Sequence, residues 1–293
     1  MAILTDTIRS RHRRRPALPI ALGLLVLLAR PAVRAQTPAA SPEPTPAKPQ
    51  VIVNDLSWPP YYLGGQPDRP KGFAKEVLEL CIPETGFTPH FVPYPIPRMY
   101  PMLENGTLDV HIVSHRPERE AYLAYGTEPV FHSSYRPVVR VGSGIEIHSI
   151  EDFDPLRLGH ISGLKYTEAF LDYVERRDKE GHLETVTQEE IALRMLVAGR
   201  IDVYVGSPPG ARWVAQEMGI GDRIEVLDFD LRTRPYYVVV SKRSANVHDP
   251  VAFHDAVDRC LREIKSDGRY AEIARRYGVD ETGPPAADQS PDD

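Results

Sequence analysis

Two arginines near the middle of the chain, Arg116 and Arg119, have the side chains best suited to bind an anion. They follow Gly106, which predicts the end of a helix, and an apolar run at residues 108–113, which predicts a buried strand. Open α/β sheets bind ligands at the carboxyl ends of their strands, where a guanidinium group can hold a carboxylate or phosphate with two hydrogen bonds. The alternative is that both arginines are solvated charges beside Glu118, since charged side chains are mostly exposed.

The N-terminal segment has the pattern of an export signal. Residues 9–15 are rich in arginine, residues 17–29 are apolar, and residues 33–35 offer a small-residue cleavage site. We expect a cleaved signal peptide over residues 1–35 and a periplasmic protein. We expect no membrane insertion after cleavage, because the apolar run is too short for a comfortable span. Residues 36–49 are rich in proline and predict a disordered tether, and residues 281–293 predict a disordered tail.

The mature chain is expected to be strongly acidic. The full sequence has a formal charge of −6, and the signal segment carries seven arginines and one aspartate, so its removal leaves −12. This charge argues against nucleic acid or an anionic membrane as the partner, because both need a basic surface. With 293 residues, of which 42% are hydrophobic, the chain is long enough for two globular domains.

The sequence contains two cysteines, Cys81 and Cys260. Export to an oxidising compartment favours a disulfide between them. Both also lie on apolar helix faces, where a free cysteine would pack as a small hydrophobic residue, so the pairing stays open. No grouping of cysteine and histidine has the spacing of a zinc site, and we expect no metal.

Apolar spacing over the first half predicts alternating strands and helices. In order, we expect a strand at 51–53, a helix from residue 73, a strand at 89–92, a helix at about 98–105 and a strand at 108–113. This order is typical of a parallel sheet. Trp58 and Tyr61 lie on a proline-stiffened loop after the first strand, where aromatic side chains can stack on a ligand or cover the core.

A short segment of the second half is similar in sequence to one in the first half. Residues 102–110 and 195–203 share five of nine identities at an offset of 93, and the same offset places Ser207 opposite Ser114. Helix–glycine–strand units share some of these signals for physical reasons alone. The match nevertheless favours two lobes of like construction.

The rest of the second half has the elements of such a lobe. A strand at 156–161 leads through a turn at 162–165 into a helix, whose N-terminus would favour an anion. Thr187 and Glu190 have the spacing of a capping box that opens another helix. Residues 236–240 and 135–141 are strand-like, and we expect them to pair and to cross between the lobes.

In order and spacing, the motifs resemble those of the periplasmic solute-binding proteins of ABC importers, in the amino-acid-binding family 3 with the type II fold. The resemblance runs from about Val51 to Val279. The motifs on which the resemblance rests are Trp58-Pro59-Pro60-Tyr61, Gly72-Phe73, Gly106-x-x-Asp109 leading to Pro117-Glu118-Arg119, Gly199-x-x-Asp202, and residues 264–270.

This resemblance implies an α/β fold of two lobes, each a mostly parallel sheet flanked by helices, joined by two extended crossover strands. We assign residues 50–138 and 238–280 to lobe 1, and residues 139–237 to lobe 2.

The resemblance also implies where a solute is held. The family arginine at the position of Arg119 binds a ligand α-carboxylate, the aromatic residue at Trp58 stacks on the ligand, and the helix N-terminus near Gly163 adds donors. The candidate ligand-binding residues are Trp58, Tyr61, Ser114, Arg116, Arg119, Gly163, Lys165 and Ser207. We expect no catalytic residue and no cofactor.

Three positions depart from the family pattern. Arg116 stands where threonine is common, Leu164 where a small hydroxylated residue is common, and Ser207 where an acid pairs with the ligand ammonium. Without that acid a buried ammonium lacks its counter-charge, so an organic acid fits better than an α-amino acid. Asp55 could still supply the acid from lobe 1.

The expected function is capture of a small carboxylate-bearing solute, an amino acid or an organic acid. A monomer would deliver the solute to a membrane ABC permease. One alternative is a ligand-sensing partner of a membrane receptor. Another is a periplasmic dehydratase-like enzyme on the same fold, with His115 or His160 as a general acid. We do not expect catalysis, since a solitary loop histidine is more often simply exposed.

Overall fold

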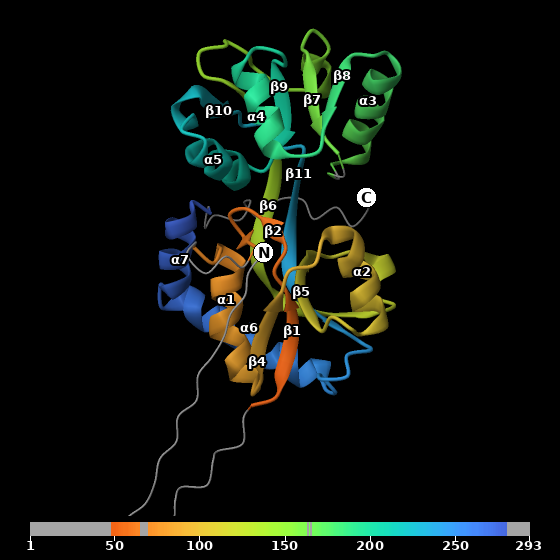
Figure 1. The fold of residues 1–293 in the computed structure, drawn as a ribbon, viewed down its shortest axis with the longest axis vertical. Helices are drawn as coiled ribbons and strands as arrows, with labels where there is room; N and C mark the ends of the chain where they lie inside the picture. The colour runs from red at the N-terminus through yellow and green to blue at the C-terminus, as the bar shows by residue number, and fades with distance from the viewer. Residues whose placement is uncertain (1–47, 65–69, 163, 165, 280–293) are drawn as a thin grey trace, which may run out of the picture. The chain divides into compact units, whose positions relative to one another are not determined.

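The computed structural model describes residues 48–64, 70–162, 164 and 166–279. The expected signal peptide, most of the tether and the expected C-terminal tail lie outside these residues, as do Gly163 and Lys165. The described chain is a mixed α/β structure built on one nine-stranded sheet, in the order β4-β1-β5-β11-β6-β9-β7-β8, with β10 paired to β6 (Figure 1). The fold class expected from the sequence is confirmed.

Lobe 1 contains a parallel core of three strands extended by an antiparallel one. These are β1 (Gln50–Asn54), β4 (Thr88–Val92), β5 (Val110–Ser114) and the antiparallel β11 (Arg232–Ser241). Its helices are α1 (Phe73–Cys81), α2 (Ile96–Asn105), α6 (Pro250–Ser266) and α7 (Arg269–Tyr277).

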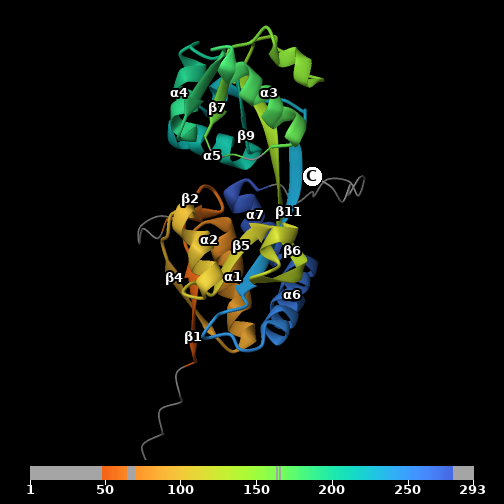
Figure 2. The same cartoon turned by 90° about the vertical axis from the view of Figure 1, so that its right-hand side faces the viewer.

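Alternate residues of these strands pack against different helices. Val238 and Val240 of β11 join the core cluster of α1, α6 and α7, whereas Val239 between them joins α2. This is the period of two that a strand imposes on its side chains, and it places α2 on the opposite face of the sheet from α1 and α6 (Figures 1 and 2).

Lobe 2 repeats this construction. Its strands are β7 (Leu158–Ile161), β8 (Leu183–Val186), β9 (Val203–Gly206) and β10 (Ile224–Val226), and its helices are α3 (Glu168–Lys179), α4 (Glu189–Val197) and α5 (Pro208–Glu217). Strand β7 lies parallel to both β8 and β9. Helices α4 and α5 share a core cluster with Tyr204 of β9, while α3 packs with Val203 and Val205 on the other face.

Two long strands connect the lobes. Strand β6 (Leu123–Arg140) is antiparallel to β11 as far as Tyr135 and then pairs with β9 from Arg136. The two strands pair as expected, but the register expected between residues 236–240 and 135–141 is wrong. Tyr236 lies opposite Phe131 and Val240 opposite Ala124, because β11 enters the ladder already at Arg232, opposite Tyr135.

Several local expectations need correction. Helix α4 begins at Glu189 after an N-cap Gln188 whose side chain makes no capping bond, so the capping box at Thr187 is wrong. Helix α2 begins at Ile96 rather than near 98, which places Pro101 inside the helix rather than in its first turn. Helix α5 was not expected, since Pro208-Pro209-Gly210 resembles a loop. Proline is nevertheless well suited to the first helical positions, where an N–H has no helical partner.

Short elements complete the described chain. They are the β2–β3 hairpin (Ser57–Trp58 and Tyr62–Leu63) and the 3₁₀ turns η1 (Ile82–Thr85), η2 (Pro117–Arg119), η3 (Ile150–Phe153) and η4 (Gly221–Arg223).

A disulfide joins the last residue of α1, Cys81, to Cys260 in the middle of α6. Their Cα atoms are 5.4 Å apart, and both residues are buried in the lobe 1 core. The structure thus decides between the two sequence-based alternatives in favour of the bridge. It fixes the C-terminal helical segment against the N-terminal half of the same lobe.

Candidate functional site

The carboxyl end of β5 delivers the predicted arginines. The strand is buried from Val110 to Val113, and Ser114 is its first partly exposed residue. Arg116 then precedes the turn η2, which Arg119 ends. The chain therefore places both guanidinium groups just beyond a buried parallel strand, where α/β sheets bind their ligands.

Arg119 is held against an aromatic ring at this edge. Its guanidinium lies 4.2 Å from the centre of the Tyr100 ring of α2, and Nη1 donates a long hydrogen bond of 3.4 Å to the Ser114 carbonyl. The residue remains partly exposed. A cation over an aromatic face is oriented without being neutralised, so its positive charge stays available to an anion.

Tyr125 of β6 lies within the field of Arg119. Burial raises the pKa of Tyr125 to about 12, although the positive charge of Arg119 opposes this shift. Tyr125 is therefore a neutral hydroxyl at physiological pH, and it offers no negative charge to Arg119.

Arg116 is held by a weaker contact than Arg119. Its Nη1 donates to Glu118 Oε1 at 3.2 Å, but that carboxylate is 62% exposed and the arginine side chain is 33% exposed. An ion pair so open to water contributes less than about 1 kcal/mol. Arg116 can therefore exchange Glu118 for a solute carboxylate at little cost.

Sequence reasoning missed two further cations at the start of β11, Arg232 and Arg234. Arg232 Nη1 donates to the Tyr166 carbonyl at 3.2 Å. Burial lowers the pKa of Arg232, and the charges of Arg234 and Arg116 lower it further. The like charge of Arg116, in the loop after β5, therefore acts on the start of β11. The available signal was the Arg-Thr-Arg alternation, which puts both side chains on one face of a strand.

The aromatic loop separates into a partly exposed residue and a buried one. Trp58 is partly exposed, with its ring 5.3 Å from Tyr236 and 4.6 Å from Tyr61. Tyr61 is fully buried and stacks on Phe131 at 4.2 Å. Trp58 is therefore placed to meet a solute, whereas Tyr61 supports Trp58 from behind.

Tyr236 lies between the aromatic loop that carries Trp58 and the end of β5 that precedes the two arginines. This residue pairs with Ser114 across the β5–β11 ladder, and its ring lies beside Trp58. The tryptophan and the arginine-bearing turn, which are far apart in the sequence, therefore flank one tyrosine.

On the side of lobe 2, Ser207 caps helix α5. Its Oγ accepts a hydrogen bond of 3.2 Å from the Gly210 amide, and the residue is 7% exposed. A carboxyl group that sequence reasoning missed, Glu189 at the start of α4, lies beside this cap and accepts a hydrogen bond of 3.3 Å from the Tyr204 hydroxyl. Burial raises the pKa of Glu189 to about 7.

Asp55 is a buried carboxylate of lobe 1. It is 1% exposed and forms an ion pair of 2.7 Å with Lys75. One oxygen of this carboxylate, Oδ2, is therefore engaged by Lys75.

The two lobes meet where the aromatic loop approaches α5. A Cβ atom on Gly210 would lie 3.4 Å from the Pro59 carbonyl oxygen, and the ring of Trp213 in α5 lies 5.8 Å from that of Tyr277 in α7. The loop that carries Trp58 and the loop that carries Ser207, both singled out in the sequence, are therefore neighbours.

The two histidines considered as general acids have separate surroundings. His115 Nε2 lies 2.6 Å from the exposed Glu120 carboxylate, and His160 Nδ1 lies 3.4 Å from the Tyr166 hydroxyl. His115 follows β5 in lobe 1, whereas His160 lies in β7 of lobe 2. Each ring therefore has an acidic or phenolic neighbour within its own lobe.

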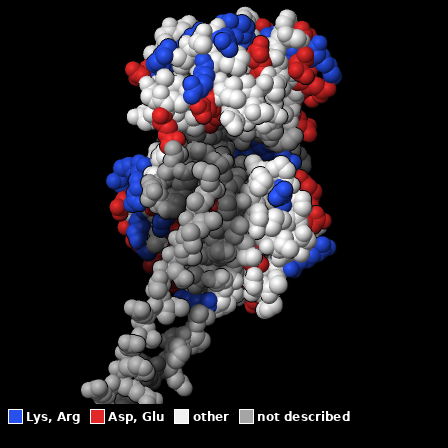
Figure 3. All heavy atoms as spheres, viewed as in Figure 1, with Lys and Arg blue, Asp and Glu red and all other residues white. Residues whose placement is uncertain are grey.

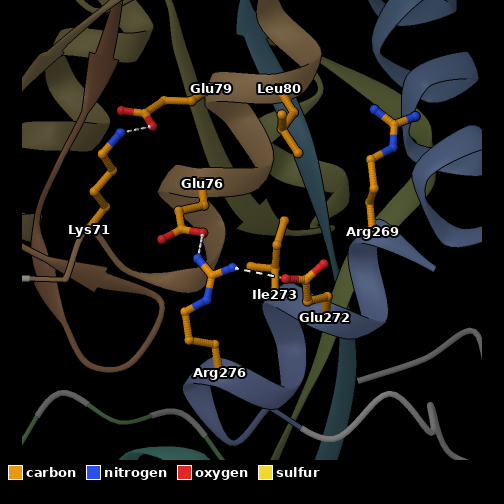
Figure 4. A pocket seen from close by; sticks show the side chains of 8 residues that line it. All are labelled: Lys71, Glu76, Glu79, Leu80, Arg269, Glu272, Ile273 and Arg276. Atoms are coloured by element: carbon orange, nitrogen blue, oxygen red, sulfur yellow. Dashed lines mark hydrogen bonds and ion pairs between the residues drawn. The ribbon is translucent and has the colours of Figure 1, made fainter.

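A hollow of roughly 570 Å³ between α1 and α7 does not have the features of a solute site (Figure 4). Its charged side chains pair with one another: Lys71 with Glu79 at 2.6 Å, and Arg276 with Glu76 at 2.6 Å. The Tyr277 hydroxyl also donates to Glu76. These contacts fasten α7 to α1 and leave little unbalanced charge for a ligand.

The described surface has no strongly polarised side in the view of Figure 3, where acidic and basic side chains are interspersed. Among the residues that the structure describes, no helix combines the length and apolar character needed to cross a membrane.

Comparisons with known proteins agree with this arrangement. Residues 51–280 match the family model described as "Bacterial extracellular solute-binding proteins, family 3". No curated protein matches the chain.

Many solved structures share the fold. Among them, a histidine kinase sensor domain with similarity to periplasmic binding proteins has a TM-score of 0.60 at 20% identity, covering 79% of this chain and 96% of its own. A mutant of ArgBP from T. maritima has a TM-score of 0.59 at 19% sequence identity, and the match covers 79% of this chain and 96% of that protein. The GluR0 ligand-binding core of Nostoc punctiforme, bound to L-glutamate, has a TM-score of 0.57 at 20% sequence identity, and the match covers 78% of this chain and 100% of that protein.

Proposed function

Because the chain belongs to the bacterial extracellular solute-binding proteins of family 3, we propose that it binds a small carboxylate-bearing solute between its lobes and delivers it to a membrane ABC permease. The observation that carries the ligand class is Arg119, a partly exposed guanidinium fixed over Tyr100 just beyond β5. A guanidinium recognises a carboxylate with two parallel hydrogen bonds.

The surroundings of Arg119 support an anionic group in the ligand. Arg116 has only a weak surface partner, and the pKa of Arg232 is lowered by burial and further by the charges of Arg234 and Arg116. A bound carboxylate relieves the repulsion among these cations. Trp58 offers an aromatic face to the rest of the solute. We assign no ligand contact to Tyr61, because its side chain is fully buried.

The hinge strands suit a protein that closes on its ligand. Within the described residues, β6 and β11 are the strands that continue from one lobe into the other, and the pairing of β6 changes from β11 to β9 between Tyr135 and Arg136. Closure around two such strands would remove water from Arg119 and strengthen its interaction with the solute.

We further propose that the protein acts in the periplasm as a monomer and without catalysis. Sensing is a second candidate function, since a histidine kinase sensor domain has a similar fold. A sensor and a transport protein would use the same ligand site. A copurified permease or kinase would distinguish them.

Native mass spectrometry of freshly purified protein tests the ligand class directly. A copurified mass, identified by fragmentation, should belong to a compound with at least one carboxylate. The second arm is a calorimetric panel of amino acids, monocarboxylates and dicarboxylates. Binding confined to solutes that lack an anionic group would contradict the proposal.

A further inference from the structure

The loop after β5 carries Arg116 towards the start of β11. Strand β5 is antiparallel to β11, and its last residue, Ser114, lies opposite Tyr236. The chain that leaves Ser114 therefore continues in the direction of Arg234 and Arg232, which precede Tyr236 in β11. It reaches Arg116 two residues later in an extended conformation, with φ −149° and ψ 127°. The antiparallel pairing thus brings a cation of this loop to two cations of a crossover strand.

Arg232 and Arg234 lie on one face of β11. They are two residues apart in a part of the strand that pairs regularly with β6, so their side chains project to the same side. Burial lowers the pKa of Arg232, and the charges of Arg234 and Arg116 lower it further. All three side chains are partly exposed. Arg232 therefore combines partial burial with two like charges, an arrangement that an anion would stabilise.

Two carboxylates of these segments are already engaged or exposed. Glu118, which pairs with Arg116, is 62% exposed. Asp230 accepts a hydrogen bond of 3.0 Å from the backbone amide of Arg232 and another from the Thr233 hydroxyl. Asp230 is itself exposed to solvent. Water therefore weakens what these two acids contribute to the cations.

Other neighbours of Arg232 are neutral groups. Its Nη1 donates a hydrogen bond of 3.2 Å to the Tyr166 carbonyl, and the phenols of Tyr135 and Tyr236 lie within its field. Burial raises the pKa of both phenols, so neither carries a negative charge near neutral pH. A phenol can donate a hydrogen bond to an anion, and these two therefore suit an anionic group beside Arg232.

Arg119 lies at a different level of the β6–β11 ladder. Its charge acts on Tyr125 of β6, ten residues before Tyr135, which lies opposite Arg232. Arg116 connects the two levels, because its charge acts both on Arg232 and on the phenol that the Arg119 guanidinium covers. The cations thus form two places for an anion rather than one.

We propose that the solute carries two anionic groups, one bound by Arg119 and the other by Arg116 and Arg232. The proposal rests on the proposed function and narrows its ligand class to dicarboxylates and phosphorylated carboxylates. A pair of guanidinium groups can hold either kind of second anion, which would offset the repulsion between them. Since β11 crosses between the lobes (Figures 1 and 2), the second anion would be bound at the hinge.

Pairs of probes that differ by one anionic group test this proposal. The pairs are succinate beside butyrate, glutarate beside pentanoate, phosphoglycolate beside glycolate, and L-glutamate beside L-norvaline. The two members of a pair have the same number of carbon atoms. The phosphorylated pair distinguishes a phosphate from a carboxylate at the second place. In the last pair both members carry an amine, so that a requirement for this group does not conceal the comparison.

Calorimetry of the wild type at pH 7.5 gives the first result. For the pair of best-fitting length, the member with the second anionic group should bind at least about tenfold more tightly, since hydrogen bonds between charged groups are the strong ones. Equal affinities within every pair would overturn the proposal.

Variants then identify the arginines. Arg232→Gln keeps amide donors but removes the charge, whereas Arg232→Lys keeps the charge. Arg223→Gln is the matched control, because Arg223 is exposed and lies beside Val141, just beyond the far end of β6. Arg232→Gln should abolish the preference for the second anion, as should Arg116→Gln. The affinity for the member with one anionic group should change less than about threefold, because separate subsites act independently.

Arg232→Lys should keep part of the preference, and Arg223→Gln should keep all of it. A purely structural role for Arg232 would lower the melting temperature and weaken both members of each pair alike. That result would also overturn the proposal.

Failure of this inference can be told apart from failure of the proposed function. If the two members of every pair bind equally tightly and their binding depends on Arg119, the proposed function stands and this inference falls. If none of these anions binds, both fall.

Discussion

Replacing both Cys81 and Cys260 by alanine should destabilise lobe 1 by several kcal/mol. The two residues are separated by 179 positions, so the bridge closes a very long loop in the unfolded chain. The chain-entropy relation gives about 5 kcal/mol for a loop of this length, and native bridges typically contribute about 2–5 kcal/mol. We therefore expect the double variant to lose about 3–5 kcal/mol of unfolding free energy.

Urea unfolding followed by tryptophan fluorescence measures this loss. Trp58 and Trp213 both pack against the core cluster of lobe 1 that contains the bridge, so their emission reports on the relevant transition. The variant should unfold at lower urea and with a steeper dependence on denaturant, since its unfolded chain exposes more surface.

A reductant provides the control. It should shift the wild-type transition towards that of the double variant and leave the variant's own transition unchanged. An unfolding free energy within about 1 kcal/mol of the wild type would refute the reasoning, because it would mean that α6 and α7 are held to α1 by packing alone.

Three further predictions concern stability. Asp202 has a pKa of about 2 because Arg157 binds it, so Asp202→Asn should cost about 2 kcal/mol at pH 7 by thermal unfolding, an effect that disappears between about pH 4 and 2. Burial lowers the pKa of His111 to about 3, so wild-type stability should fall by about 2 kcal/mol from pH 7 to 4.5, and a fall of the same size in His111→Leu would contradict this. Gly106 and Gly199 both have positive φ, but of these two only Gly106 would bring a Cβ atom against backbone, at 2.0 Å. Gly106→Ala should therefore lower the free energy of unfolding by at least ~2 kcal/mol more than Gly199→Ala does.

The sequence was sufficient for most of the fold because local signals and global topology agree. The apolar stripe from Phe253 to Ile264 lies in α6, and Gly106 ends α2 in a left-handed conformation. The two similar lobes could be expected for the same reason. The register of β6 against β11 could not be predicted, because a long strand of half-buried residues such as Tyr135 fits several registers.

The site was less accessible to sequence reasoning. Arg119 could be singled out because it follows a buried strand in the same local segment. Glu189 and Gly210 could not, because they converge only after α4 and α5 begin at the same sheet edge, and the proline pair at 208–209 obscured α5. Tyr61 shows the converse, since its residue type and neighbours do not indicate that it turns inward while Trp58 stays partly exposed.

The most direct test of the account is the affinity of Arg119→Ala for the solute that copurifies with the wild type. An anion left without its guanidinium partner loses roughly 3 kcal/mol, so we predict a dissociation constant about 100-fold higher by calorimetry. Arg262→Ala, on the exposed side of α6, removes the same charge elsewhere and should bind as the wild type does. Wild-type affinity in Arg119→Ala would contradict the central claim that this arginine holds the solute carboxylate.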